Sequence, residues 1–245
     1  MTTTTSTSRR SSSSDDARSL TVSLRDGGEV HVRCSTRDDG DFHRLDVPFG
    51  ELEARRRAFV DLPWTMLDEH HGVGVRRVTE PGEHDGAPGD VAVTAIDDAV
   101  LGCWVGDCAP VVLVGGDGDV AVAHAGWRGL AAGVLDVAAG TVGALAHVAL
   151  GPVIGPCCYE FGRGDLERVA AGGRLRPDEI AGRTTAGGLA LDVGRVVDGF
   201  ATRLGTTVTR LGGCTGCAYP GFSHRVRRDP QRHVVAVWRT TGGRS

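Results

Sequence analysis

The feature that most constrains this chain is a pair of short valine-rich runs joined by a glycine-rich turn. Val111 to Val114 and Val120 to Val122 are separated by Gly115-Gly116-Asp117-Gly118-Asp119. Valine runs bounded by such a turn are typical of two buried strands in a hairpin. We therefore expect Cys108, just before the first run, and His124, just after the second, to lie near one end of the ladder. That geometry suits a metal site, or a thiolate paired with its base.

Composition limits the classes of protein and of partner. The chain has 245 residues, of which 40% are hydrophobic and 24% charged, which is typical of a globular protein. A net charge of -4 and an aromatic content of 5% argue against a nucleic-acid partner. No apolar run reaches the ~18 residues of a membrane span, and the first residues lack a secretion signal, so we expect a cytosolic protein without a membrane partner.

We expect a mixed α/β (α+β) fold with one domain over residues 18–242, since no repeat or linker interrupts the chain. Residues 1–17 form a Thr/Ser tract that predicts a disordered tail. Further strands are expected at residues 20–25, 29–33, 73–78, 147–150, 206–211 and 234–238, and helices at 48–62, 128–145, 165–171 and 193–204.

Two charged segments are expected at the surface. The basic run Arg55 to Arg57 in the first helix is interpreted as a solvated face. The Gly/Pro/acid-rich segment from Glu80 to Asp90 is interpreted as a mobile surface loop.

Seven cysteines are an odd number for a disulfide framework, so at least some thiols should be free. Cys214 and Cys217 form a CxxC pair, but a structural zinc site takes four ligands and the chain has no second CxxC. We therefore expect no zinc site there, and interpret Cys157 and Cys158 as packed thiols. Cys108 considered alone is also compatible with a small buried side chain.

Two further positions stay ambiguous from the residues alone. Arg37 follows an expected strand end, where an arginine can bind phosphate or carboxylate or simply form a surface ion pair. His70 and His71 precede an expected strand, and because alternate strand residues face opposite ways, only one of them can reach a shared site.

Several motifs together resemble the YfiH-type laccase-domain family, long labelled polyphenol oxidases and now understood as zinc-dependent purine nucleoside phosphorylases. The resemblance spans roughly residues 19–240 in consistent order. The motifs are His71-Gly72, Gly106-Asp107-Cys108-Ala109-Pro110, Ala123-His124-Ala125-Gly126-Trp127-Arg128-Gly129, Gly151-Pro152-Val153-Ile154 with Cys158-Tyr159-Glu160, and Phe222-Ser223-His224-Arg225.

The resemblance implies β-sheets covered by helices and a catalytic zinc held by His71, Cys108 and His124, with copper as a second candidate metal. It also implies substrate-binding roles for Arg37, His224 and Arg225. The implied substrates are phosphate and a purine nucleoside, namely adenosine, inosine, guanosine or S-methyl-5'-thioadenosine, with adenosine deamination as an additional activity. Either Asp107 or Glu69 would carry the proton, and the protein would be a monomer or a small homo-oligomer.

The chain departs from the family pattern in three places. The family commonly has Gln-x-His-Gly, whereas Glu69 stands here in place of the amide. Val226-Arg227 is inserted before Arg228-Asp229, and the loop from Asp38 to Val47 is short and acidic.

Two other enzymatic functions are alternatives to this one. A metal-free hydrolase would use His124 to deprotonate Cys108 for nucleophilic attack. A copper-dependent polyphenol oxidase would need paired His-x-His motifs, and the sequence has none.

Overall fold

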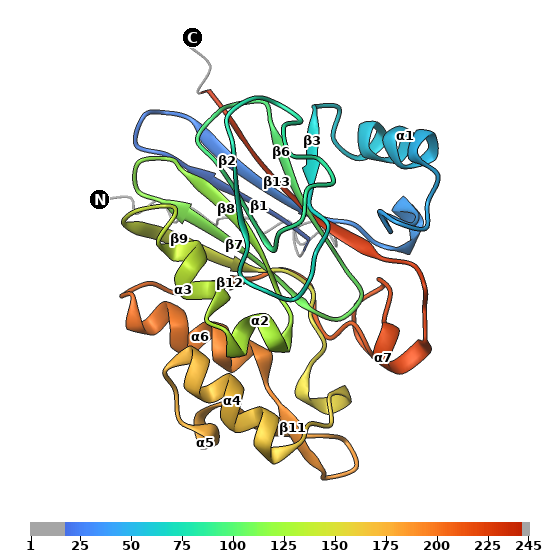
Figure 1. Cartoon of the computed structure of the whole chain (residues 1–245), viewed down its shortest axis with the longest axis vertical. Helices are drawn as coiled ribbons and strands as arrows, with labels where there is room; N and C mark the ends of the chain where they lie inside the picture. The colour runs from blue at the N-terminus through green and yellow to red at the C-terminus, as the bar shows by residue number, and fades with distance from the viewer. Residues whose placement is uncertain (1–17, 242–245) are drawn as a thin grey trace, which may run out of the picture.

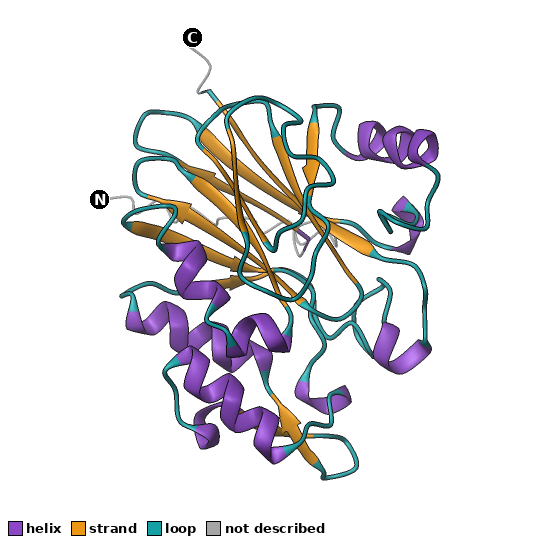
Figure 2. Cartoon of the chain, in the orientation of Figure 1, coloured by secondary structure: helices purple, strands orange, loops and turns teal. Residues whose placement is uncertain are grey.

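A computed structural model describes residues 18–241, so the tail predicted over residues 1–17 lies outside the described residues. Two β-sheets lie against each other, with α1 on one outer side and α2 to α6 on the other (Figure 1). Apart from a small hairpin at residues 181–191, which lies beside the helices, the strands and the helices occupy separate layers (Figure 2), which confirms the mixed α/β fold.

The first sheet has five strands in the order β1-β2-β13-β6-β3, and the second has six in the order β12-β9-β7-β8-β5-β4. The first contains β1 (Ser19–Ser23), β2 (Glu29–Cys34), β3 (Trp64–Met66), β6 (Val100–Val105) and β13 (His233–Thr240). The second contains β4 (Val75–Val78), β5 (Val91–Thr94), β7 (Ala109–Gly115), β8 (Val120–Ala125), β9 (Leu145–Leu150) and β12 (Val208–Arg210). A separate hairpin is formed by β10 (Ala181–Arg183) and β11 (Leu189–Leu191).

The helices are short. They are η2 (Arg37–Asp39), α1 (Phe49–Phe59), α2 (Trp127–Ala131), α3 (Val134–Ala139), η3 (Pro156–Cys158), α4 (Arg163–Gly173), α5 (Pro177–Ile180), α6 (Val193–Arg203) and α7 (His224–Arg227). Within the described residues, no helix is both long and apolar enough to cross a bilayer.

The valine-rich runs form strands buried on both faces. Val111 and Leu113 of β7 belong to the core shared with the helices, whereas Val112 and Val114 pack between the two sheets. Complete burial of one such side chain contributes about 1.5–3 kcal/mol. The run is continuously apolar because neither face of β7 meets water.

The expected hairpins are confirmed. β7 pairs with β8 in antiparallel register, and β1 pairs with β2 around the turn at residues 24–28. The strand β6 runs directly into β7 through residues 106–108, so this three-residue corner carries the chain from one sheet to the other.

The single helix predicted over residues 128–145 is wrong. Gly133 has a φ of 83° and separates α2 from α3, and α3 ends at Ala139. A left-handed residue cannot continue a right-handed helix, and glycine adopts that conformation without steric cost.

The interpretation of the basic run as a solvated face is wrong for Arg56, which is only 2% exposed. Arg56 makes two hydrogen bonds of 3.1 Å to Asp85 and one of 2.6 Å to Glu53. The loop expected at the surface is therefore tied to α1 through Asp85, and its last residue, Asp90, is buried.

Candidate functional site

His71, Cys108 and His124 come together where the two sheets meet. One ligand atom from each lies within 4.8 Å of those of the other two. Cys108 is the last residue of the corner between β6 and β7. His124 on β8 pairs with Pro110, two residues after Cys108, so the β7–β8 ladder brings the side chains of Cys108 and His124 together. Cys108 Sγ lies 3.7 Å from His71 Nε2.

The structure selects between the two adjacent histidines. The His70 side chain is 57% exposed and lies 3.7 Å from Asp68. His71 has a φ of 59°, and its ring centroid lies 4.7 Å from that of His124. This left-handed turn directs His71 towards Cys108, so His71 is the residue that can complete a metal site.

Asp90 connects His124 to the loop that carries His71. Antiparallel pairing of Val91 with Ala123 places Asp90, just before β5, opposite His124. The Nδ1 atom of His124 lies 2.9 Å from the Asp90 carboxylate, which also accepts the backbone N–H groups of His71 and Gly72 at 2.8 Å. A carboxylate on Nδ1 leaves Nε2 of the imidazole available for a metal.

Opposite charges on the Cys108 thiolate and the protonated His124 stabilise each other. Burial raises the pKa of Cys108, but His124 and His71 outweigh this effect and lower it to about 6. Burial opposes protonation of His124, whereas Glu69, Cys108 and Asp90 raise its pKa well above the usual value. The pocket thus favours the thiolate, the form that binds metals and acts as a nucleophile.

Glu69 lies on the buried side of the same cluster. Its Oε2 atom is 3.7 Å from His124 Nδ1, and its Oε1 atom accepts the backbone N–H of Trp104 at 3.2 Å. Burial raises the pKa of Glu69 to about 7. Glu69 can therefore hold or release a proton near neutral pH.

Gly126 explains part of the motif around His124. A Cβ atom at this position would lie 2.5 Å from Cδ2 of His71 and 3.2 Å from Sγ of Cys108. Only a residue without a side chain lets the start of α2 pass this close to both side chains.

A cavity of about 440 Å³ opens over the three residues, within the size range of small-molecule sites. Trp127 and Tyr159 line it and are supported from behind by Phe161, with ring-centroid distances of 5.8 and 5.1 Å. Arg225 and Arg232 also line it. Their guanidinium groups donate to backbone carbonyls, Arg225 to Glu160 at 2.9 Å and Arg232 to Pro230 at 2.7 Å, and neither forms an ion pair with a carboxylate of residues 18–241.

Asp107 and His224 line the cavity as well. The Asp107 carboxylate accepts hydrogen bonds from the Thr215 hydroxyl at 2.6 Å, the Ser223 hydroxyl at 2.8 Å and the Arg225 backbone N–H at 2.6 Å. Asp107 therefore connects two parts of the chain, namely the corner that contains Cys108 and the start of α7.

Arg37 does not reach the cavity. Its guanidinium forms an ion pair with Asp229, donates to the carbonyl of Gly221 at 2.9 Å and lies over the Phe222 ring. The ion-pair alternative considered for this residue is the one found, although its partner is 192 residues away. Arg232 also lines the cavity, and no motif in the sequence points to it.

Comparison with known proteins identifies the family. Residues 38–240 match the family described as multi-copper polyphenol oxidoreductase laccase, and the chain belongs to that family. The crystal structure of a Bacillus licheniformis protein named YfiH shares the fold, with a TM-score of 0.72 and 20% identity, covering 85% of this chain and 92% of that one. The YfiH-type resemblance is thereby confirmed.

Relatives named purine nucleoside phosphorylase match parts of the chain. One from Xylella fastidiosa (strain 9a5c) is 44% identical over 95 residues, covering 36% of this chain and 33% of that protein. One from Streptomyces coelicolor is 32% identical over 197 residues, covering 77% and 80%. The first match thus spans only a third of its relative's length.

Proposed function

We propose that the protein is a zinc-dependent purine nucleoside phosphorylase. The observation that carries the proposal is the convergence of His71, Cys108 and His124 in a cavity that is also lined by Arg225 and Arg232, whose guanidinium groups form no ion pair with a carboxylate of residues 18–241. The name borne by the relatives agrees with this chemistry.

The three side chains fit zinc. One thiolate and two imidazoles match the ligands that zinc prefers, and three protein ligands leave a fourth position for water or substrate. The lowered pKa of Cys108 and the carboxylate on His124 Nδ1 prepare two of the ligands for a cation. When bound, zinc would supply Lewis-acid polarisation of a substrate oxygen.

The other cavity residues account for the substrates. Arg225 and Arg232 would bind phosphate, because within the described part of the chain no carboxylate forms an ion pair with either guanidinium. Trp127 and Tyr159 line the cavity with aromatic surface that a purine can contact. We assign no phosphate contact to Arg37, whose guanidinium is occupied by Asp229.

In the reaction a phosphate oxygen forms a bond to the anomeric carbon as the bond from that carbon to the purine nitrogen breaks. The electron pair of the broken bond stays with the purine, which gains a proton. Glu69 suits this proton transfer better than Asp107, because its pKa of about 7 lies near the working pH and three donors already occupy Asp107.

Copper oxidation of phenols has less support. A blue-copper site adds a methionine to two histidines and one cysteine. Met66, the only methionine among the described residues, is buried beneath α1 with Phe42 and Phe59. The site formed by His71, Cys108 and His124 thus lacks the axial methionine of a blue-copper site, and the sequence lacks the His-x-His motifs of a multicopper oxidase.

The metal-free hydrolase is the alternative that the geometry keeps open. Cys108, His124 and Asp90 are ordered as nucleophile, base and orienting carboxylate. His71, on the other hand, contacts the same sulfur and has no role in that mechanism. Alkylation of Cys108 in metal-free protein would abolish amide hydrolysis if the hydrolase were correct.

The deciding assay incubates the zinc-loaded protein with adenosine, inosine, guanosine or methylthioadenosine, each with and without phosphate. We expect free base and a ribose 1-phosphate product only when phosphate is present. Conversion of adenosine to inosine in the same reaction would reveal deamination. Absence of phosphate-dependent base release for all four nucleosides would contradict the proposal.

A further inference from the structure

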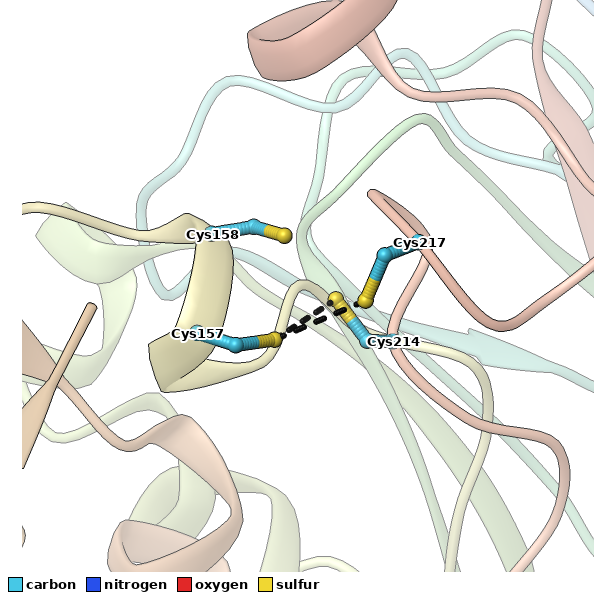
Figure 3. A group of neighbouring side chains, drawn as sticks. All are labelled: Cys157, Cys158, Cys214 and Cys217. Carbon is cyan, nitrogen blue, oxygen red and sulfur yellow. Dashed lines mark hydrogen bonds between the residues drawn. The ribbon is translucent and has the colours of Figure 1, made fainter. Parts of the chain in front are cut away.

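Four cysteines from two distant segments form a second cluster, which we call the four-cysteine cluster. Cys157 and Cys158 belong to η3, and Cys214 and Cys217 lie in the loop after β12. Their sulfur atoms all lie within 4.8 Å of one another. Figure 3 shows the side chains from both segments directed towards a common space.

The sulfur separations match those around a metal ion. Cys157 Sγ lies 3.6 Å from Cys214 Sγ and 3.6 Å from Cys217 Sγ. A disulfide would require about 2.05 Å. Four sulfurs at the usual Zn–S distance of about 2.3 Å form a tetrahedron with edges of about 3.8 Å. The two measured distances are therefore close to a tetrathiolate edge.

We propose that the four-cysteine cluster binds one Zn²⁺ through four thiolates and is a structural metal site separate from His71, Cys108 and His124. A closed set of four cysteine ligands is the composition of structural rather than catalytic zinc sites. The site has no position for substrate, and its function is to hold two loops together.

The backbone around the cluster is shaped for this role. The Gly155 N–H group donates a hydrogen bond of 3.1 Å to Cys214 Sγ, and such bonds stabilise a thiolate. A Cβ atom on Gly155 would lie 3.2 Å from Cys214 Cβ, and one on Gly216 would lie 2.9 Å from Cys158 Sγ. The two glycines allow the loops to approach closely enough for the sulfurs to meet.

Contacts outside the cluster hold the two loops in place before any metal binds. Val153 and Cys214 form a β-bridge, and Thr215 N–H donates to the Val153 carbonyl at 3.2 Å. The Gly216 carbonyl accepts a 3.0 Å hydrogen bond from Arg227. Zinc would therefore bind to positions that the fold has already brought together, which reduces the entropy cost of binding.

The cluster also borders the catalytic cavity. Tyr159, which lines the cavity, directly follows Cys158, and Thr215 in the CxxC loop donates to Asp107 at 2.6 Å. A metal in the cluster would fix the loop that carries Tyr159 relative to the corner that carries Cys108. The second site would thus stabilise one wall of the first.

The sequence predicts no zinc site here because the chain has no second CxxC motif. The third and fourth sulfurs come instead from adjacent cysteines 56 or more residues upstream, which local spacing does not reveal. The interpretation of Cys157 and Cys158 as packed thiols is therefore replaced by a ligand role in this proposal.

The test measures zinc per chain in the full-length protein, purified under reducing conditions, by elemental analysis. We expect two zinc ions in the wild type and one in Cys214→Ser/Cys217→Ser. His71→Ala/His124→Ala should also retain one, held by the cluster. Cys34→Ala, which removes a buried thiol of the sheet core, is the matched control and should retain two.

Cobalt distinguishes the two sites in the wild-type protein without relying on the folding of a variant. Four thiolates give stronger sulfur-to-cobalt charge-transfer absorption than one, and two equivalents of Co²⁺ should produce both signals. The proposal is overturned if Cys214→Ser/Cys217→Ser retains all the zinc of the wild type. It is equally overturned if mass spectrometry shows that these sulfurs form disulfides in the purified protein.

Discussion

Asp90 and His124 face each other across the β5–β8 ladder, with the carboxylate 2.9 Å from the Nδ1 atom of the imidazole. The same carboxylate accepts the backbone N–H groups of His71 and Gly72. Two of the three candidate ligands therefore depend on one side chain that does not itself belong to the ligand set. Asp90 therefore positions the site without binding the metal itself.

Asp90→Asn should weaken zinc binding at the His71–Cys108–His124 site by about 10- to 100-fold, as is usual when the partner of a ligand histidine is removed. The amide cannot accept every hydrogen bond that the carboxylate accepts. Competition with a chromophoric chelator measures the change, in a Cys214→Ser/Cys217→Ser background so that one site is titrated. Asp98→Asn, in an exposed turn, is the control and should leave affinity unchanged.

Gly126→Ala should damage the same site by steric contact, since the new Cβ atom would lie 2.5 Å from His71. Overpacking costs about 1–3 kcal/mol, which corresponds to a loss of about 5- to 150-fold in zinc affinity. Gly50→Ala in α1 is the matched control, because its Cβ atom would meet nothing within 4 Å. Equal zinc affinity in the two variants would contradict the close contact between the start of α2 and His71.

Arg56→Ala should lower the free energy of unfolding by about 3–5 kcal/mol, because it leaves carboxylates without their buried partner. Urea denaturation measures the difference. Arg57→Ala, one position away on the exposed side of α1, should change stability by no more than about 0.5 kcal/mol. Similar values for the two variants would mean that the Arg56–Asp85 pair does not hold α1 to the neighbouring loop.

His233 should make stability depend on pH. Burial lowers its pKa from 6.5 to about 3, so between these values the unfolded chain binds a proton that the folded chain does not. The contribution is complete above pH 6.5 and is lost as the pH falls towards 3, by up to about 1.4 kcal/mol per pH unit.

Urea denaturation between pH 7 and pH 5 tests this dependence. His233→Phe should show a smaller loss of stability on acidification than the wild type, because it removes the titrating group. His70→Gln changes a side chain that is 57% exposed and should follow the wild-type profile. If His233→Phe instead loses stability as steeply as the wild type, His233 is not the source of the slope.

Local sequence patterns predict the parts of the site that depend on strand pairing. The valine runs and their glycine turn were sufficient to bring Cys108 and His124 together, because strand pairing follows from the pattern. The burial of Arg56 was also within reach, since it lies four residues after Leu52 and three before Phe59, the other buried positions of α1. Its charge led to the wrong interpretation.

Other parts of the site depend on contacts that local patterns do not contain. Only the family resemblance predicts His71 as a metal ligand, because the residues alone do not separate it from His70. Asp90 was missed because the four-residue strand β5 follows a Gly/Pro-rich loop and was not predicted. Had that strand been recognised, its register with β8 would have placed Asp90 opposite His124.

The proposed function requires that zinc at the His71–Cys108–His124 site supports phosphorolysis. It is tested most directly by measuring ribose 1-phosphate formed from adenosine and phosphate as metal-free protein is reloaded with zinc. We predict that activity returns with zinc in the wild type and not in His71→Ala/His124→Ala. Full activity in the metal-free wild type, or phenol oxidation with copper and no phosphate-dependent base release with zinc, would contradict the account.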